Sequence, residues 1–364
     1  MRRYEIDWIR NISILMLFVY HTCAIFCVFG DFYIVSQEKN LFANLFIILL
    51  FVWYMPMLFF LAGASTYFSS KKRSFKQYLL ERIKKLLIPF LFGTIFLVPP
   101  QTYLARIWRG ESDLNYFEHL KYFFTTLTDF SGFDGAFTPA HLWFILYLFI
   151  VSIIAGIIIF KLFNSKKGMN IVNMLINVLF SKSSFIILLL IGVISDIFPS
   201  IMGKSIVACL IIFIMGYIVY SNDDILDKII LNRFKLLWIL ILTLTLGMMY
   251  VFLLRENISD KLIWFIDSIL KNIVLICAIG SVTAFSSLHL NKNNLVLRYL
   301  NKSAFPVYIV HQPVLLGLAF FIIPLVKSTT LAMVLIIVIS LIITFLLVEY
   351  MKRLKVFNVA LGLK

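Results

Sequence analysis

Charged residues are scarce in this chain of 364 residues: Asp, Glu, Lys and Arg make up 14% of it. A typical soluble domain has about a quarter of its residues charged and roughly half apolar. Here 62% are hydrophobic, and the mean hydropathy is +0.97. One compact core could not keep so much apolar surface away from water. The scarcity of charge therefore excludes an ordinary soluble domain and predicts the lipid bilayer as the main partner.

Cysteine is also rare, and none of the familiar soluble-domain motifs is present. The four cysteines lie in apolar stretches with no pairing pattern and no metal-ligand spacing, at Cys23, Cys27, Cys209 and Cys277. We find no nucleotide-binding glycine motif, no internal repeat and no cleavage site after the first apolar run. We therefore expect one integral-membrane domain over residues 1–364, no metal and no permanently bound cofactor.

Long apolar runs are abundant. A bilayer span needs about 20 mainly apolar residues, and a backbone in lipid must satisfy its own hydrogen bonds, so each run predicts a helix. The fold class predicted is all-α: a polytopic transmembrane helical bundle of about ten spans. These are Ile9–Phe29, Leu41–Phe68, Leu86–Leu104, His141–Phe163, Ser183–Phe198, Ser205–Ser221, Phe234–Leu254, Leu262–Ser287, Ser303–Leu325 and Thr330–Tyr350.

The net charge of +15 is distributed unevenly along the chain. Basic residues gather at Arg2–Arg3, Lys71–Lys85, Lys161–Lys182 and Lys352–Lys364, whereas the connection Ala105–Ala140 is rich in acids. Basic loops stay on the cytoplasmic side of a membrane. This alternation predicts cytoplasmic termini, an outward-facing Ala105–Ala140 connection and location in a cell membrane. It also explains the charge without a nucleic-acid partner.

Two ionisable residues stand out in the first span. Arg10 and His21 are eleven positions apart, about 20° from three full turns, so they share one helix face at an axial separation of about 16 Å. Arg10 is expected near the cytoplasmic surface, and His21 deep in the membrane, where such a group is costly and indicates function. Arginine binds phosphate, and histidine acts as general base or nucleophile. The alternatives are an interfacial anchor for Arg10 and an interhelical hydrogen bond for His21.

Five segments follow one another in a recognisable order. Asp7-Trp8-Ile9-Arg10 is followed after ten residues by His21, and later come Pro56–Gly63, Arg82–Pro89, His141–Phe144 and Asn301–His311. Together they resemble the acyltransferase-3 family of membrane-bound acyltransferases, from Asp7 to about Pro313. Three departures are Ala62 in place of the usual serine, lysine at 84 and 85 where a second arginine is commoner, and Pro306 inside the last segment.

The resemblance implies an enzyme that moves an acyl group from a cytoplasmic donor to hydroxyls of an extracytoplasmic carbohydrate. The donor is usually acyl-coenzyme A, which would be a co-substrate. His21 would be catalytic, with Asp7 and Arg10 in the same site. A further implication is that Arg82, Lys84 and Lys85 offer charge to the coenzyme A phosphates. Membrane orientation alone also accounts for that basic cluster.

Four later residues are candidates for substrate contact. Tyr308 and His311 are three residues apart and face one way on a helix, in the cytoplasmic half of the predicted span. They could contact substrate or form an interhelical hydrogen bond. His141 and Trp143 are expected at the outer interface, where His141 could meet the acceptor and Trp143 suits the aromatic belt. Pro313 predicts a kink whose freed carbonyl lines a cavity.

Two other classes of protein compete with an acyltransferase. A transporter or flippase of a glycan or lipid-linked intermediate would also use intramembrane ionisable residues, but such proteins often have repeated halves, and none are visible here. A sensor or scaffold leaves the Arg10 and His21 alignment unexplained. The acyl group (acetyl or succinyl), the acceptor, the oligomeric state and the choice between base and acyl carrier for His21 stay open. Frequent Lys, Ile and Asn favour a bacterial source, and hence the bacterial cytoplasmic membrane.

Overall fold

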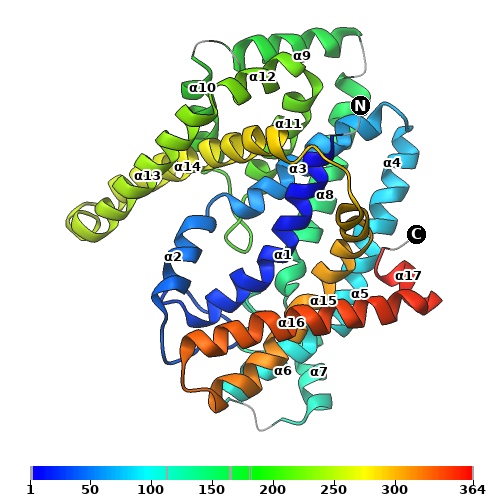
Figure 1. Cartoon of the computed structure of the whole chain (residues 1–364), viewed down its shortest axis with the longest axis vertical. Coiled ribbons are helices and arrows are strands. Elements are labelled where there is room, and N and C mark those ends of the chain that lie inside the picture. The colour runs from blue at the N-terminus through cyan, green and yellow to red at the C-terminus, as the bar shows by residue number, and fades with distance from the viewer. Residues whose placement is uncertain (1–2, 112–113, 164–165, 180, 182, 363–364) are drawn as a thin grey trace. The chain divides into compact units, whose positions relative to one another are not determined.

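The computed structural model describes residues 3–111, 114–163, 166–179, 181 and 183–362. Over these residues the chain is helical, with an isolated β-bridge between Ile201 and Lys204 and no strand, which confirms the all-α prediction. Arg2, Lys182 and Lys364, which entered the orientation argument, lie outside the described residues. Figure 1 shows the order of the helices along the chain.

Eight stretches of the described chain are long and apolar enough to cross a membrane. A ninth is possible if α11 (Ile206–Ser221) and α12 (Asp223–Leu231), bent by 99° at their junction, count as one span. Helix α10 (Ser184–Ser195) has only 12 residues. The chain is thus a multi-pass membrane protein, while the count of ten and the cytoplasmic termini stay predictions. The eight are Tyr4–Phe26, Leu41–Ser70, Phe75–Trp108, Ala140–Phe163, Arg233–Val251, Asp260–His289, Leu295–Leu325 and Thr329–Arg353.

The helices form two compact units, each assembled from three segments of the chain. Helices α1 (Tyr4–Phe26), α2 (Leu41–Leu50), α4 (Phe75–Arg82) and α8 (Trp143–Ile157) contribute residues to both units. The prediction of one domain over residues 1–364 stays a prediction. Unit 1 comprises Met1–Arg10, Leu49–Leu79 and Ile150–Asn293, and unit 2 comprises Asn11–Ile48, Leu80–Phe149 and Asn294–Lys364.

A close helix crossing forms the centre of unit 1. Helix α3 (Tyr54–Ser70) meets α11 at two glycines. A Cβ atom built on Gly63 would lie 1.8 Å from the Phe213 carbonyl oxygen, and one on Gly216 would lie 1.9 Å from the Phe60 carbonyl oxygen. Small residues at such crossings let helix backbones touch in a membrane protein. Gly63, the last residue of the second motif, therefore has a packing role.

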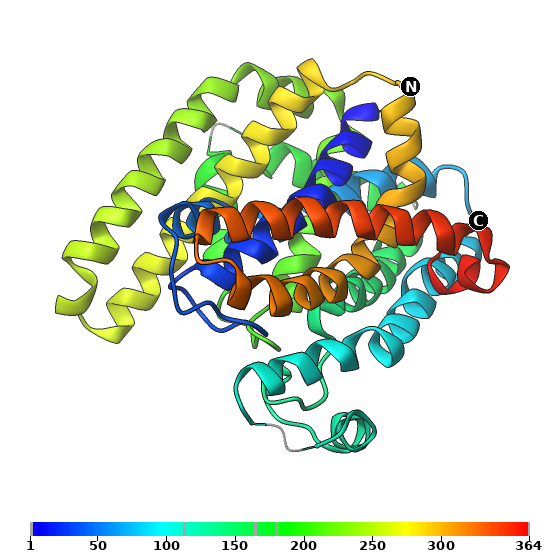
Figure 2. The ribbon, with the colours of Figure 1, turned by 60° about the horizontal axis from the view of Figure 1, so that its bottom comes forward.

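Unit 1 also contains a long helical hairpin of α13 (Arg233–Leu253) and α14 (Asp260–His289), visible in Figures 1 and 2. Helix α10 is joined to α14 through one carboxylate. Asp196 accepts hydrogen bonds from Ser268 Oγ at 2.6 Å and Asn272 Nδ2 at 3.0 Å, and it pairs with Lys271. This network holds the short helix α10 against its neighbour.

Replacing Asp196 by Ala is expected to lower the free energy of unfolding by about 1–3 kcal/mol, because part-buried donors on α14 lose their acceptor. Chemical denaturation of the detergent-solubilised protein would measure this loss. The exposed Asp227 in α12 provides the matched control, since its replacement by Ala removes the same charge from the surface. Equal effects of the two substitutions would contradict the structural role of Asp196.

The core of unit 2 is formed by α15 (Leu295–Leu325) and α16 (Thr329–Arg353), which lie side by side in Figure 2. Helix α15 begins at Leu295, eight residues before the predicted start of the span at Ser303. It is capped by Asn294, whose side chain accepts from Leu297 N at 2.8 Å. The first turns of α15 contain polar residues, so hydropathy alone placed the start of the helix too late. At the same end of the pair, Lys352 Nζ near the end of α16 donates to Ser303 Oγ at 2.6 Å.

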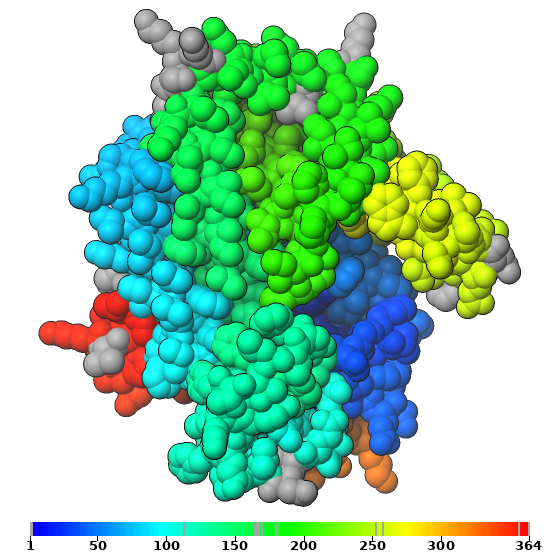
Figure 3. Space-filling view, turned by 180° about the vertical axis from the view of Figure 1, so that it is seen from behind, coloured from blue at the N-terminus to red at the C-terminus, as the bar shows by residue number. Residues whose placement is uncertain are grey.

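The connection between α6 (Val98–Trp108) and α8 is folded rather than extended. It contains α7 (Tyr116–Thr125), and residues 116–140 form a rounded projection in Figure 3. His119 in α7 is buried and interacts through Nε2 with Thr102 Oγ1 at 3.0 Å and the Pro99 carbonyl oxygen at 3.1 Å. Burial lowers the pKa of His119, which suits a neutral structural histidine.

Candidate functional site

The end of α1 is covered by the loop that follows it. The loop returns to the helix, where Ser36 N donates to the Ile25 carbonyl and Asn40 N to the Phe26 carbonyl, both at 2.9 Å. These bonds satisfy carbonyls that a helix end leaves unpaired. The loop also places the ring of Phe32 nearly parallel to that of His21, with centroids 5.6 Å apart and planes at 12°. His21 thus lies in the last turns of α1, half-buried under an aromatic ring.

Three histidines from distant parts of the sequence meet in unit 2. The His21 and His311 rings stack with centroids 5.2 Å apart and planes at 29°, and His141 meets His311 edge-on at 5.2 Å. We call His21, His141 and His311 the histidine cluster. The prediction that His141 and His311 lie at different depths is wrong, because the early start of α15 places His311 near the middle of that 31-residue helix.

His311 uses one ring nitrogen within its own helix. Its Nδ1 lies 2.6 Å from the Tyr308 carbonyl oxygen, which can only accept, so Nδ1 carries the proton. A neutral imidazole has one N–H, and Nε2 therefore keeps a bare lone pair. Nε2 is buried without a hydrogen-bond partner in the described part of the chain. His311 thus presents an unmatched acceptor.

In His141 the two ring nitrogens have the reverse roles of those in His311. Its Nε2 lies 3.0 Å from the Ile309 carbonyl oxygen and must be the protonated nitrogen, whereas its Nδ1 is buried with no partner among the described residues. The Tyr308 hydroxyl in turn donates to the His141 carbonyl. The preceding Ala140 has φ of +47°, a strained conformation of the kind that occurs at functional sites. Strain, burial and two hydrogen bonds thus hold this histidine.

The cluster as a whole has unmatched ring nitrogens. Nδ1 of His21 is also buried without a partner in the described structure, so each of the three rings has one such nitrogen. An unmatched buried acceptor costs about 1–3 kcal/mol, and in native proteins it calls for an explanation such as a ligand or water. The arrangement suits a ligand that brings O–H or N–H groups. A neutral histidine beside a hydroxyl can also remove its proton.

Asp7 and Arg10 are paired with each other near the start of α1. The Arg10 guanidinium lies 2.8 Å from an Asp7 carboxylate oxygen, and Trp8 Nε1 donates to the Lys292 carbonyl at 2.9 Å. Helix α1 runs unbroken from Tyr4 to Phe26, so Arg10 and His21 are on one face at an axial distance of about 16 Å. The charged pair and the histidine cluster are therefore two separate positions along α1.

The predicted donor-binding residues lie where α4 passes into a π-helical turn over Ile83–Leu87. Ile88 N donates to the Ile83 carbonyl, and Pro89 has no N–H to continue the normal pattern. Such π-turns are frequent at functional sites. Lys84 is exposed, Lys85 Nζ lies 3.6 Å from Glu81, and Arg82 is half-buried. Lys84 therefore projects its charge to the surface, while Lys85 shares its charge with an acid.

Trp143 begins α8 and packs its ring edge-on against Tyr147, with centroids 5.5 Å apart. It is half-buried and follows the cluster residue His141 by two positions. This contact fits an aromatic anchor at the start of α8.

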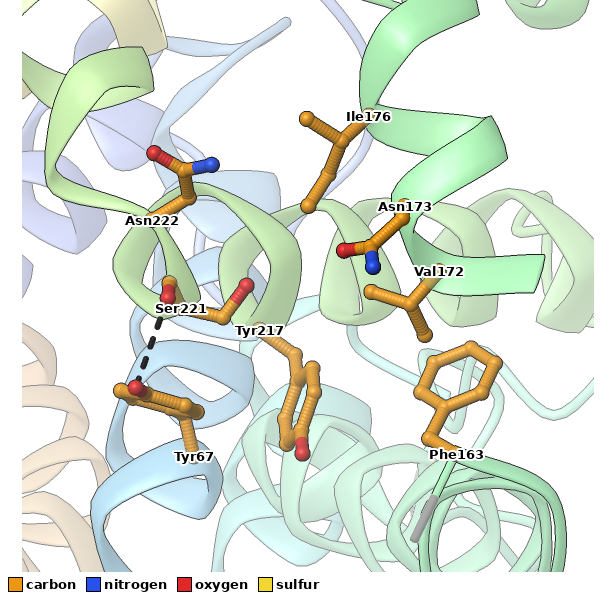
Figure 4. A pocket seen from close by; sticks show the side chains of 8 residues that line it. All are labelled: Tyr67, Phe163, Val172, Asn173, Ile176, Tyr217, Ser221 and Asn222. Atoms are coloured by element: carbon orange, nitrogen blue, oxygen red, sulfur yellow. Dashed lines mark hydrogen bonds between the residues drawn. The ribbon is translucent and has the colours of Figure 1, made fainter. Parts of the chain in front are cut away.

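A cavity of about 280 Å³ in unit 1 has no predicted site residue in its lining (Figure 4). Tyr67 donates a hydrogen bond to the Ser221 carbonyl at its wall, at 3.4 Å. Its lining consists of Tyr67, Phe163, Val172, Asn173, Ile176, Tyr217, Ser221 and Asn222. Separately, no group of three or more His, Cys, Asp or Glu is placed to hold a metal ion in the described ranges.

Comparison with known families decides the class of this protein. A family model described as an acyltransferase domain matches residues 3–349. The chain belongs to the acyltransferase-3 family. It is therefore a membrane acyltransferase, and the match includes all five motif segments and the whole histidine cluster. No curated protein and no solved structure matches the chain.

Several residues around the acyltransferase's histidine cluster were not found by sequence reasoning. Phe32 is in a loop without a motif, and Phe18, whose ring is 5.5 Å from that of His311, looks like any apolar residue of a span. The Ile309 carbonyl had a sequence signal, because Pro313 stands four positions later and cannot donate to it. No sequence pattern could show that His141 donates a hydrogen bond to this carbonyl.

Proposed function

We propose that this acyltransferase moves an acyl group, such as acetyl or succinyl, from acyl-coenzyme A to a hydroxyl of a glycan or glycoside. The observation that carries the proposal is the histidine cluster, whose three unmatched ring nitrogens include one on His21. A carbohydrate hydroxyl supplies the donor that these nitrogens lack. The family membership supports acyl transfer as the reaction class.

The reaction at His21 can be written with all atoms balanced. The acceptor hydroxyl gives its proton to His21 while its oxygen forms a bond to the thioester carbonyl carbon. The carbon–sulfur bond then breaks, and the coenzyme A thiolate takes the proton from His21. In a second version a nitrogen of His21 attacks the thioester carbonyl carbon first, and the carbon–sulfur bond breaks to give acyl-histidine and coenzyme A thiolate. The hydroxyl oxygen then bonds to the acyl carbon as the bond to His21 breaks, and the hydroxyl proton passes to the thiolate. Both versions need a neutral His21, which an apolar membrane environment favours.

The donor is proposed to bind through positive charge on the cytoplasmic side. Arg82, Lys84 and Lys85 offer guanidinium and ammonium groups next to the π-helical turn, and Arg10 offers a guanidinium already oriented by Asp7. Arginine forms bidentate hydrogen bonds with phosphate, whereas lysine acts as a point charge. The diphosphate of coenzyme A would bind to Arg82, Lys84 and Lys85.

The acceptor is proposed to enter from the opposite side of a cell membrane and to contact His141, Tyr308, His311 and Trp143. His141 and His311 accept hydrogen bonds from hydroxyls through Nδ1 and Nε2. The Tyr308 hydroxyl already donates to the His141 carbonyl, so its part is to hold the site in shape. Trp143 would contribute an apolar face at the edge.

Transfer in sealed liposomes would test this function. Purified protein is given radiolabelled acetyl-coenzyme A on one side and a series of glycans on the other. We expect label to appear on a glycan hydroxyl together with stoichiometric release of coenzyme A. Accumulation of unmodified glycan inside the liposomes, with no acyl transfer, would contradict the proposal and indicate a transporter instead.

A further inference from the structure

A proline in the middle of α15 leaves one backbone carbonyl without its usual partner. In a regular helix the N–H of residue 313 would donate to the carbonyl of Ile309. Pro313 has no N–H, so this acceptor is open to another donor. The donor is the buried Nε2–H of His141, 3.0 Å from the Ile309 oxygen, and His141 belongs to a segment 168 residues away in the sequence.

A second hydrogen bond runs between the same two segments in the opposite direction. The Tyr308 hydroxyl donates to the His141 carbonyl, while His141 Nε2 donates to the carbonyl of the next residue, Ile309. The two bonds clamp the start of α8 to the kinked part of α15. Because the bond to Ile309 needs a proton on Nε2, it excludes the other neutral tautomer of His141.

The clamp lies directly beside His311. His141 meets the His311 ring edge-on at 5.2 Å, and the two histidines are held by the carbonyls of two successive residues, Tyr308 and Ile309. The Tyr308 carbonyl holds Nδ1–H of His311, and the Ile309 carbonyl holds Nε2–H of His141. Successive carbonyls of one kinked helix thus assign the proton on each ring and leave His311 Nε2 bare.

We propose that Pro313 and His141 are positioning residues: the Ile309 carbonyl that Pro313 frees fixes the tautomer of His141 and holds its ring against His311. His311, whose own tautomer is fixed by the Tyr308 carbonyl, then presents a bare Nε2 to the hydroxyl of the acceptor. This inference rests on the proposed acyl transfer at the same site. His311 accepts a hydrogen bond from the hydroxyl and orients its oxygen for attack, while His21 takes the proton. If Nε2 of His311 carried a proton, it could not accept a hydrogen bond from the hydroxyl, and the hydroxyl would not be oriented for attack.

Substitutions at His141 separate positioning from proton transfer. Glutamine places its amide nitrogen where Nε2 of histidine lies, so His141→Gln keeps the donor to Ile309, whereas the shorter amide of His141→Asn falls short of it. Both substitutions remove the Nδ1 acceptor of His141, so the readout is the difference between them: we expect the kcat of His141→Gln to stay about tenfold above that of His141→Asn. His141→Asn should lose about 100-fold in kcat, as a displacement of about 1 Å can do, with KM for acyl-coenzyme A unchanged. Equal losses in both variants would overturn the positioning role.

Proline variants test the source of the free carbonyl. Pro313→Ala restores an N–H that competes for the Ile309 oxygen, and we expect kcat to fall about tenfold with KM for the donor unchanged. Pro324→Ala is the matched control, since Pro324 also lies inside α15 but is exposed near its end. An effect of Pro324→Ala as large as that of Pro313→Ala would show a general response of the helix and contradict the inference.

The tautomers can be observed without any turnover. Nitrogen NMR of histidine-labelled protein distinguishes protonated from bare ring nitrogens, and His141→Gln and His311→Gln assign the signals. We expect a proton on His141 Nε2 and His311 Nδ1, and a shift of the His141 signal in Pro313→Ala only. A protonated His311 Nε2 overturns the inference even if acyl transfer occurs. The expected tautomers without acyl transfer support the clamp and contradict the proposed function instead.

Discussion

Replacement of His21 by Gln is expected to lower the rate of acyl transfer by about 10²–10⁴-fold, the usual contribution of a positioned histidine to proton transfer. Glutamine is close in size to histidine and keeps a polar end under Phe32, but it can neither accept a proton nor carry an acyl group at neutral pH. The loss should fall on kcat, while KM for acyl-coenzyme A changes little. That pattern indicates an interaction made in the transition state.

Two measurements make this prediction decisive. His289→Gln is the matched control, because His289 is exposed at the end of α14 and belongs to neither the histidine cluster nor the motifs. Thermal unfolding of each variant reports whether the fold survives the substitution. Coenzyme A release at the native rate in a folded His21→Gln protein would falsify the catalytic assignment. Mass spectrometry after incubation with donor alone would distinguish an acyl-histidine from direct transfer.

Replacement of Gly63 by Ala is expected to lower the free energy of unfolding by about 3 kcal/mol or more, at the upper end of the cost of overpacking. The new methyl group would lie 1.8 Å from the Phe213 carbonyl oxygen, so α3 and α11 would have to separate. Gly216→Ala meets the Phe60 carbonyl at 1.9 Å and should behave alike. Both clashes are with backbone atoms, which cannot rotate aside as a side chain can, so the clash can be relieved only by moving one helix away from the other.

Gly317 in α15 provides the matched control for this prediction. A Cβ atom at Gly317 has no neighbour within 4 Å among the described residues, so Gly317→Ala should stabilise the helix by about 0.5–1 kcal/mol. Unfolding in detergent, followed by circular dichroism over a denaturant series, would compare the variants. A Gly63→Ala protein as stable as Gly317→Ala would show that α3 and α11 do not cross as closely as described.

The positions of the helices and their local relationships could be read from the sequence. Apolar runs identified every long span, because a helix in lipid needs a certain length of apolar residues. The shared face of Tyr308 and His311 followed from helix periodicity. Boundaries were less accurate where polar residues belong to a helix: α15 begins at Leu295 rather than Ser303, because Asn294 caps it and hydropathy does not register a cap. The short polar helix α7 was missed for a similar reason.

The candidate site was found only as separate pieces. His21, His141, His311 and Tyr308 were each singled out, yet their meeting within unit 2 could not be derived. The depth argument even separated His141 from His311, since it treated each span alone. Periodicity relates residues on one helix, whereas contacts between helices depend on crossing points such as Gly63 with Gly216. Those points are set by the packing of all spans together.

The sequence by itself determined that this chain is an all-helical membrane protein with a histidine and an arginine on one face of its first helix. These properties depend on composition and on the 3.6-residue period, which are local. Only the tertiary structure decided that a carbonyl freed by Pro313 accepts a hydrogen bond from His141, and that His311 keeps a bare nitrogen beside His21. A ring's tautomer is set by the partner it meets, and that partner comes from a distant segment of the chain.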